Sequence, residues 1–187
     1  TGTDQQVIAF EARGAAYQPD VVVLGFFLRD FSRNILSFRD YAKPRFVPDG
    51  DGLRLTNHPV IPPEELYAQY ASGVRRIGRW DRSYLVCALA RAFARRRDDA
   101  IAEWAPGWQV LSRLMTRFKA QVEAAGGLPV WLIIPYRDVL TEDAEKWDAL
   151  AAMCAAHAKA VGLPCLDLCG PFRERARLAP QEEIFLP

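Results

Sequence analysis

Three short apolar runs, each bounded by turn-forming or polar residues, predict the strands of one sheet. They cover residues 20–27, 128–134 and 163–168. The first run shows no alternation of apolar and polar positions, which is typical of a strand buried on both faces of a parallel sheet. Helical patterns separate the runs, and strand–helix–strand order is typical of parallel sheets with right-handed crossovers. The hydrophobic pattern therefore predicts the α/β class.

Apolar positions at three- and four-residue spacing predict the helices. Residues 4–17 form the first helix, with Thr3 as its N-cap. Later helices are expected over residues 62–79, 81–97, 108–125 and 141–161. Residues 98–107 interrupt this pattern and end in Pro106-Gly107, so we interpret them as a linker.

Residues 43–57 are expected to form a β-hairpin. The turn sequence Asp-Gly-Asp-Gly at 49–52 lies between two short runs that can pair, 45–47 and 53–55. The hairpin belongs to a block from about residue 38 to residue 105, which follows the first strand. We interpret this block as a cap with helical and hairpin parts, inserted into a single α/β domain that spans residues 1–187.

The composition fits one globular domain with an ordinary core, because half of the 187 residues are apolar. The formal net charge is +1, so no overall field attracts nucleic acid or a membrane surface. The cysteines at 87, 154, 165 and 169 lack the spacing of a metal site. We interpret them as small buried apolar side chains.

A basic segment at residues 75–97 carries most of the local charge. Its arginines, at 75, 76, 79, 82, 91, 95, 96 and 97, are opposed only by Asp81. A solvated helix face is the favoured interpretation. Contact with an anionic membrane surface, or with a polyanionic substrate, is the weaker alternative. A nucleic-acid role is disfavoured, because no known nucleic-acid-binding fold accompanies the arginines.

Polar residues follow the first strand at the place where open α/β sheets bind their ligands, just past the carboxyl ends of the strands. Arg29, Asp30 and Asn34 occupy this loop, and Asp167 ends the third strand. Strand-end acids also cap the turns that follow them. For Asp30 and Asp167 a structural and a functional role are therefore weighed equally.

No complete Ser-His-Asp triad is visible. None of the serines, at 32, 37, 72, 83 and 112, lies in a Gly-x-Ser-x-Gly or Gly-Asp-Ser motif. His157 lies inside a helix and is interpreted as structural. His58 follows the hairpin and is interpreted as a solvent-exposed loop residue, although a cap folded over the sheet would bring it to a cleft.

Several segments together resemble the middle of an SGNH hydrolase, the Gly-Asp-Ser type of esterase and lipase. They are Gly-Thr-Asp-Gln-Gln at 2–6, the strand and loop at 19–34, and Tyr-Ala-Lys-Pro-Arg-Phe at 41–46. The resemblance implies a flavodoxin-like three-layer fold, of which three strands are present. It also implies serine acyl transfer on carboxylic esters, including O-acetyl groups on saccharides, without a metal or other cofactor. The family places its serine before residue 1 and its Asp-x-x-His pair after residue 187. The resemblance thus makes the chain a partial domain that is inactive alone.

The resemblance also assigns site residues. The family builds its oxyanion hole from the serine amide, a glycine amide and an asparagine side chain. Gly2 is the candidate glycine, with a glycine before residue 1 as the alternative. Asp30 matches the last residue of the asparagine motif, but Arg29 stands where asparagine is expected. Either Arg29 substitutes, or Asn34 serves, or the site is weakened. We expect the Arg29 side chain at the mouth of the crevice, near Gly2 and Asp30.

In the family, the serine strand lies beside the strand corresponding to 20–27. We therefore expect the three strands here in sequential order, with 20–27 as an unpaired edge that favours aggregation. The expected substrate is a small-molecule or saccharide ester, and no nucleic-acid partner is expected. The alternative function is a non-catalytic α/β module that holds an anionic ligand with Arg29 and the cap arginines. Targeting segments can lie outside the chain, so the sequence does not assign a compartment and leaves an extracytoplasmic one open.

Overall fold

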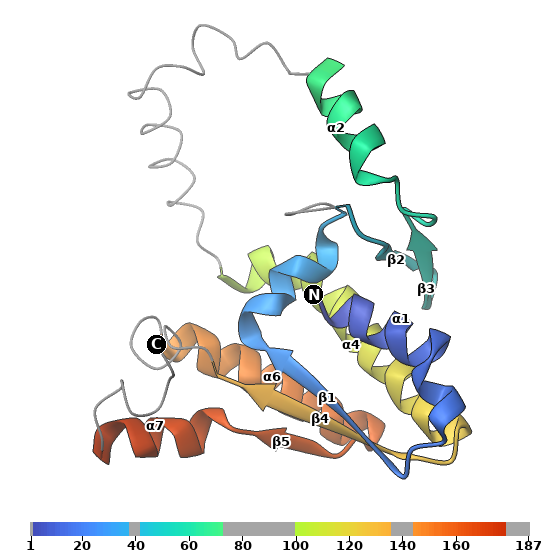
Figure 1. Cartoon of the computed structure of the whole chain (residues 1–187). Helices are drawn as coiled ribbons and strands as arrows, with labels where there is room; N and C mark the ends of the chain where they lie inside the picture. The colour runs from blue at the N-terminus through green and yellow to red at the C-terminus, as the bar shows by residue number, and fades with distance from the viewer. Residues whose placement is uncertain (1, 38–41, 73–99, 136–143, 179–187) are drawn as a thin grey trace, which may run out of the picture.

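The computed structural model describes residues 2–37, 42–72, 100–135 and 144–178 (Figure 1). In these ranges the chain forms a mixed α/β structure, in which η denotes a 3-10 helix. The elements are α1 (Thr3–Ala12), η1 (Gly14–Tyr17), β1 (Val21–Phe27), η2 (Leu28–Ile35), β2 (Arg45–Asp49), β3 (Gly52–Thr56), α2 (Pro63–Ser72), α4 (Ala100–Ala124), β4 (Leu128–Ile134), α6 (Ala144–Val161), β5 (Cys165–Asp167) and α7 (Cys169–Leu178).

The three predicted strands form one parallel sheet in the order β1-β4-β5. β1 and β4 pair along their whole length, from Val21 opposite Leu128 to Phe27 opposite Ile134. In the described part of the chain β4 is the one strand that pairs with β1, so β1 is an edge. The predicted sequential order and the edge position of residues 20–27 are confirmed.

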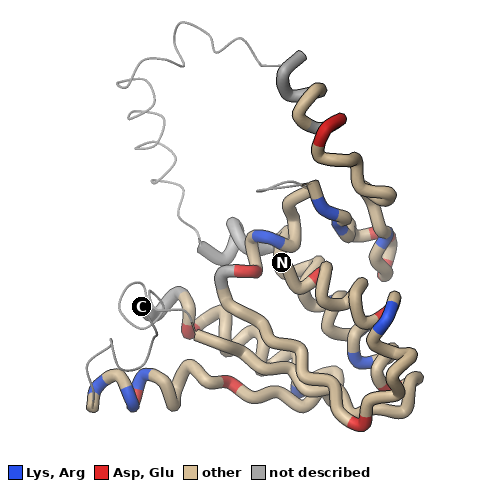
Figure 2. Tube along the Cα trace, in the orientation of Figure 1, with Lys and Arg blue, Asp and Glu red and all other residues tan. Residues whose placement is uncertain are grey.

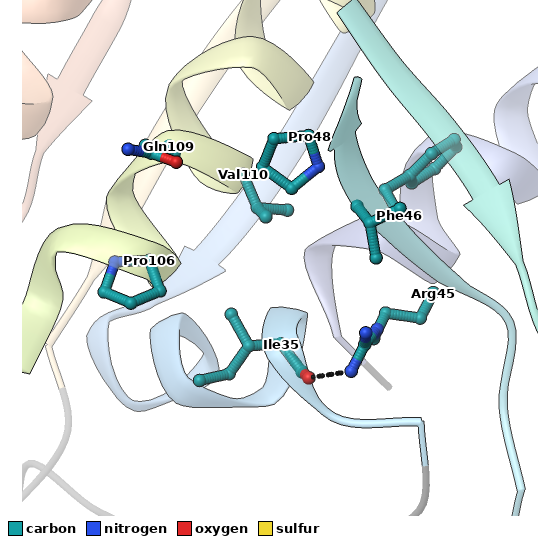
Figure 3. Close-up of a pocket in the computed structure, with 8 residues that line it drawn as sticks. Ile35, Arg45, Phe46, Pro48, Pro106, Gln109 and Val110 are labelled. Atoms are coloured by element: carbon teal, nitrogen blue, oxygen red, sulfur yellow. Dashed lines mark hydrogen bonds between the residues drawn. The ribbon is translucent and has the colours of Figure 1, made fainter. Parts of the chain in front are cut away.

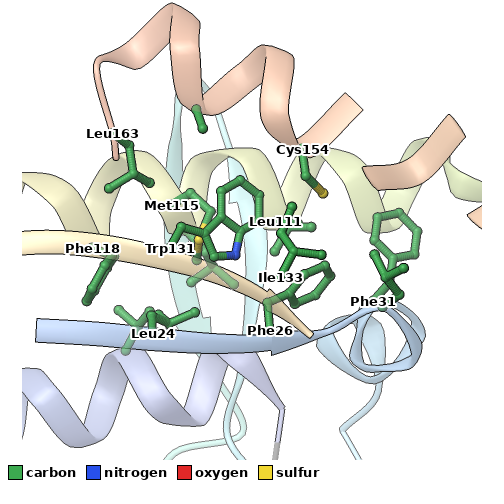
Figure 4. Close-up of a cluster of buried hydrophobic side chains, with 14 of the residues drawn as sticks. Leu24, Phe26, Phe31, Leu111, Met115, Phe118, Trp131, Ile133, Cys154 and Leu163 are labelled. Atoms are coloured by element: carbon green, nitrogen blue, oxygen red, sulfur yellow. The ribbon is translucent and has the colours of Figure 1, made fainter. Parts of the chain in front are cut away.

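The core lies on one face of this sheet, where α4 and α6 pack against it (Figure 4). Leu24 and Phe26 of β1 and Trp131 and Ile133 of β4 point toward these helices and are at most 3% exposed. The rings of Phe26 and Trp131 lie 5.7 Å apart between centroids. Burial of such large apolar side chains is the main force that holds a fold of this size together.

The opposite face of the sheet is open in this structure. Val21 and Val23 of β1 are 52% and 56% exposed, and Leu128 and Leu166 of the neighbouring strands are 51% and 57% exposed. The trace along β1 and β4 also carries no charged residue (Figure 2). The prediction that the first strand is buried on both faces is therefore wrong for this structure, because the helices α4 and α6 that follow β1 and β4 pack on the same face.

The predicted hairpin is confirmed: β2 and β3 pair antiparallel, with Asp49 opposite Gly52. The hairpin packs on α4. Phe46 is 1% exposed, and the Arg117 guanidinium of α4 lies 5.1 Å from its ring centroid. Arg113 Nη1 donates a hydrogen bond of 2.9 Å to the Gly52 carbonyl. This part of the insertion is thus attached to the main body of the domain.

Several predicted boundaries need correction. Gly2, not Thr3, is the N-cap of α1, because the N–H of Gln5 and of Gln6 both reach the Gly2 carbonyl. α4 begins at Ala100, so the linker predicted over 98–107 is wrong: alanine-rich residues before Pro106 continue the helix, and the proline lies inside it. The predicted helix at 81–97 lies outside the described residues.

An additional helix, α7, follows the third strand and was not among the predicted helices. Its first turn contains Gly170 and Pro171, and proline is favoured in a first turn because its missing N–H has no partner there anyway. No helix among the described residues combines the length and hydropathy that crossing a membrane requires.

Gly127 is expected to be essential to the closure of β4 onto β1. A Cβ at this position would lie 2.5 Å from the Pro19 carbonyl oxygen and 3.2 Å from Val122 Cγ1, and the backbone oxygen leaves little room for adjustment. Gly127→Ala should therefore lower the free energy of unfolding by about 1–3 kcal/mol in a urea titration. Gly170→Ala is the matched control, because a Cβ there meets no atom within 4 Å. Equal stability of the two variants would contradict this prediction.

Candidate functional site

The turn η2 at the carboxyl end of β1 carries Asp30 and Asn34, two of the predicted site residues (Figure 1). η2 is fixed to α4 by Phe31, which is 6% exposed. A Cβ on Gly107 would lie 2.7 Å from this ring, so glycine in α4 makes room for it. The backbone that presents Asn34 is therefore held by the core.

The Asn34 side chain is buried and holds an unused donor. It is fully buried, and its Oδ1 accepts a hydrogen bond of 3.3 Å from the Asp4 N–H. A backbone N–H can only donate, so the atom that faces it is the oxygen and the NH₂ group points elsewhere. Among the described residues, no hydrogen-bond partner is found for Asn34 Nδ2. A buried polar group without a partner is costly and calls for an explanation, and one such explanation is a functional role.

Gly2 lies directly against this side chain. A Cβ on Gly2 would lie 3.3 Å from Asn34 Oδ1 and 2.6 Å from Asp4 Oδ1, so a larger residue would displace one of these side chains. The Gly2 N–H donates a hydrogen bond of 3.1 Å to Gln5 Oε1. The structure thus brings Gly2 and Asn34 together, and in this conformation the Gly2 amide is engaged by Gln5.

A buried ion pair, which the sequence analysis did not single out, lies behind these residues. Asp4 is fully buried and Lys43 is 5% exposed, and Lys43 Nζ binds Asp4 Oδ2. Burial raises the pKa of Asp4 above its ordinary value, although the Lys43 ammonium and the Gln5 N–H act in the opposite direction. Asp4 and Lys43 lie in segments that carry the resemblance to SGNH hydrolases. This resemblance was the one sequence feature that could have pointed to them.

Asp30 is 3% exposed and accepts a hydrogen bond of 2.5 Å from Arg33 Nη1. Asp30 thus lies in the same 3-10 helix as Asn34, and the Arg33 guanidinium neutralises its charge. The backbone of Arg29 belongs to η2, but its side chain lies outside what the structure describes. The position predicted for the Arg29 side chain at the crevice stays a prediction.

His157 and Asp167 make contacts that stabilise the fold. His157 Nε2 lies 2.9 Å from the Ser112 carbonyl and its ring packs edge-on against Trp108. These contacts link α6 to α4 and agree with the interpretation of His157 as structural. His58 is exposed. Asp167 Oδ1 accepts a hydrogen bond of 2.8 Å from the Cys169 N–H, which caps α7. Ser83 and the basic segment 75–97 lie outside the described residues.

The three described cysteines are free, and their environments disfavour the thiolate. Cys169 begins α7, but burial and Asp167 raise its pKa to about 12. Burial raises the pKa of Cys165 to about 11 and that of Cys154 further still. Among the described residues, no cluster of His, Cys, Asp or Glu side chains is arranged to hold a metal ion.

We expect these thiols to resist alkylation. A rise in the Cys165 pKa from 9.0 to about 11 leaves on the order of 100-fold less thiolate near neutral pH, and the thiolate is the nucleophile. In a Cys87→Ser variant, iodoacetamide at pH 7.5 should modify the three thiols at least about 100-fold more slowly than in urea, as read by mass spectrometry. Labelling at similar rates in both conditions would contradict this.

A cavity of about 340 Å³ is lined by Ile35, the residue that follows Asn34 in η2 (Figure 3). Ile35 of η2, Phe46 and Pro48 of β2, and Val110 of α4 supply apolar walls. Arg45 extends along one side, where its Nη1 donates a hydrogen bond of 2.9 Å to the Ile35 carbonyl. The volume is at the lower end of what small-molecule sites occupy.

Comparison of the chain with protein-family models, with curated proteins and with solved structures found no match. Function is therefore inferred from the site residues themselves, above all from Gly2, Asn34 and the buried pair of Asp4 and Lys43.

Proposed function

We propose that this chain is the central part of a serine ester hydrolase of the SGNH type and that it supplies the oxyanion-binding side of the active site. The observation that carries the proposal is the buried Asn34 carboxamide, whose NH₂ group lacks a partner among the described residues. Asn34 follows the carboxyl end of β1, and parallel sheets bind their ligands at the carboxyl ends of the strands.

An oxyanion site needs donors that are already oriented before the reaction. When a nucleophile attacks an ester carbonyl, negative charge develops on the oxygen, and fixed N–H groups in a water-poor site stabilise it. The Asn34 carboxamide meets this need, because burial and the Asp4 N–H hold its oxygen and leave its two N–H bonds for an acceptor.

Asn34 is the best-supported candidate for the asparagine of the family. The Asn34 side chain is neutral and short, so the position of its amide is set by η2. Arginine at position 29 has a longer arm and a fixed charge, and would suit a permanent anion better than a charge that forms only in the transition state. Asp30, neutralised by Arg33, would stabilise the turn rather than react.

The nucleophile and its base are expected outside residues 1–187. The described serines and histidines lie in helices, exposed turns or structural contacts. The proposed reaction is acyl transfer through a serine ester, on a carboxylic ester such as an O-acetylated saccharide, and this chemistry needs no metal. Arg29, Asp30 and Gly2 would then line the substrate side of the site.

A non-catalytic module that binds an anion is the second candidate. The same unpartnered Asn34 NH₂ group would serve a resident carboxylate as well as a transient oxyanion. The two functions differ in turnover and in the presence of an activated serine.

A fluorophosphonate probe, which reacts with activated serines, separates the two. The full-length protein should hydrolyse p-nitrophenyl acetate and become labelled on a serine outside residues 1–187. The 187-residue chain alone should do neither above background. Labelling of Ser32 or Ser83, abolished by Ser32→Ala or Ser83→Ala, would show that the nucleophile lies within the chain. A full-length protein that binds acetate without labelling or turnover would favour the binding module.

A further inference from the structure

The Asn34 carboxamide is connected to the buried ion pair by a continuous set of contacts. Lys43 Nζ binds Asp4 Oδ2, and the other carboxylate oxygen accepts a hydrogen bond of 2.9 Å from the Gln5 N–H. The Asp4 N–H in turn donates to Asn34 Oδ1 at 3.3 Å. Each end of the Asp4 residue is therefore engaged, with the side chain on Lys43 and the backbone on Asn34.

The position of Asp4 in α1 determines the direction of its N–H bond. Asp4 lies in the first turn of α1, where backbone N–H groups have no partner within the helix. The Asp4 N–H is thus available to bind Asn34, and its direction is set by the orientation of the first turn of α1. Anything that fixes the first turn of α1 also fixes the oxygen of the Asn34 carboxamide.

Lys43 fixes that turn from a different part of the chain. It lies just before β2, and its own carbonyl accepts a hydrogen bond of 2.6 Å from Asn57 Nδ2 at the end of the hairpin. The hairpin is held on α4 through Phe46 and Arg113. The ammonium of Lys43 therefore ties the first turn of α1 to the hairpin, which is itself packed on α4.

A buried ion pair is poor evidence for stability, because the cost of removing both charges from water offsets most of their attraction. An apolar pair of the same volume would hold the two segments together about as well. It would not hold the Asp4 carboxylate in one orientation, with one oxygen on Lys43 and the other on Gln5.

We propose that Lys43 and Asp4 are positioning residues for the oxyanion donor: they fix the first turn of α1, so that the Asp4 N–H holds the Asn34 carboxamide with its NH₂ group toward the reacting carbonyl. The inference rests on the proposed function. Neither residue touches the substrate, so their loss should act on kcat and leave KM nearly unchanged.

The test is a double-mutant cycle on ester hydrolysis by the full-length protein. Lys43→Met should lower kcat at least about 10-fold with little change in KM. In an Asn34→Ala background the same change should have no further effect on kcat, because the donor that Lys43 positions is already gone. Lys43→Arg, which retains the charge, should recover most of the activity.

Arg117→Met is the matched control. Arg117 also pairs with an acidic residue of α1, Glu11, with an Nε–Oε1 distance of 2.6 Å, but this pair lies at the other end of the helix. It should leave kcat unchanged within about twofold. Should Lys43→Met fail to fold, Asp4→Asn takes its place in the cycle, since it removes the charge and retains the backbone N–H.

The outcomes separate the two claims. Absence of hydrolysis by the wild-type protein would overturn the proposed function. An active wild type in which the effects of Lys43→Met and Asn34→Ala simply multiply would overturn the positioning role alone. An equal loss in Arg117→Met would also overturn it, because any anchor of α1 would then serve.

Discussion

Asn34→Ala is expected to lower kcat for ester hydrolysis by about 10²–10³-fold in the full-length protein, with a much smaller change in KM. The NH₂ group is buried and already oriented, so it binds the developing oxyanion without reorganisation, and removal of one such donor typically has this effect. Steady-state kinetics with p-nitrophenyl acetate measure it.

Two further variants make this prediction specific. Asn34→Asp retains the oxygen that accepts from Asp4 but replaces the donor by a charge that repels the oxyanion, so its kcat should fall at least as far. Ser32→Ala alters an exposed residue on the same turn and should leave kcat unchanged. Full activity in Asn34→Ala would contradict the prediction. The oxyanion donor would then be Arg29 or a residue outside the chain.

Lys43→Met is expected to lower the free energy of unfolding by about 3–5 kcal/mol at pH 7, because it leaves the Asp4 carboxylate buried without its counter-ion. The loss should depend on pH. Burial already raises the folded-state pKa of Asp4 above 3.8, and loss of the ammonium raises it further. An acid whose folded pKa is raised favours folding below its unfolded pKa, and this contribution is lost as pH rises through the folded pKa.

The deficit of Lys43→Met relative to wild type should therefore shrink as pH falls from 7 toward 4. Urea titrations at several pH values measure it. The double variant Asp4→Asn/Lys43→Met removes both charges and should regain most of the stability. A single variant as stable as wild type at pH 7, or a deficit independent of pH, would contradict the prediction.

The sequence predicted the strands and the hairpin well because their signals are local. An uncharged apolar run bounded by polar or turn-forming residues marks β1 and β4, and the Asp-Gly-Asp-Gly turn at 49–52 fixes the register of the hairpin. The resemblance to SGNH hydrolases further predicted that β1 would be the edge of the sheet.

The missed features depend on contacts between distant segments. Asp4 and Lys43 are 39 positions apart, and nothing in either local pattern indicates that they pair. The open face of the sheet was missed because an apolar run shows that a strand is hydrophobic but does not show what covers each of its faces. Asn34 was a candidate by its place after a strand; its orientation depends on α1.

The long separation between β1 and its partner has a consequence for synthesis. Val21 pairs with Leu128, so roughly 100 residues must follow β1 before its neighbour exists, which takes about 5–20 s on a translating ribosome. The hairpin at 45–56 can form in that interval, but β1 cannot pair in the observed register. A seven-residue segment without charge or proline thus stays unpaired in the nascent chain, where an exposed apolar segment of this kind is an aggregation hazard.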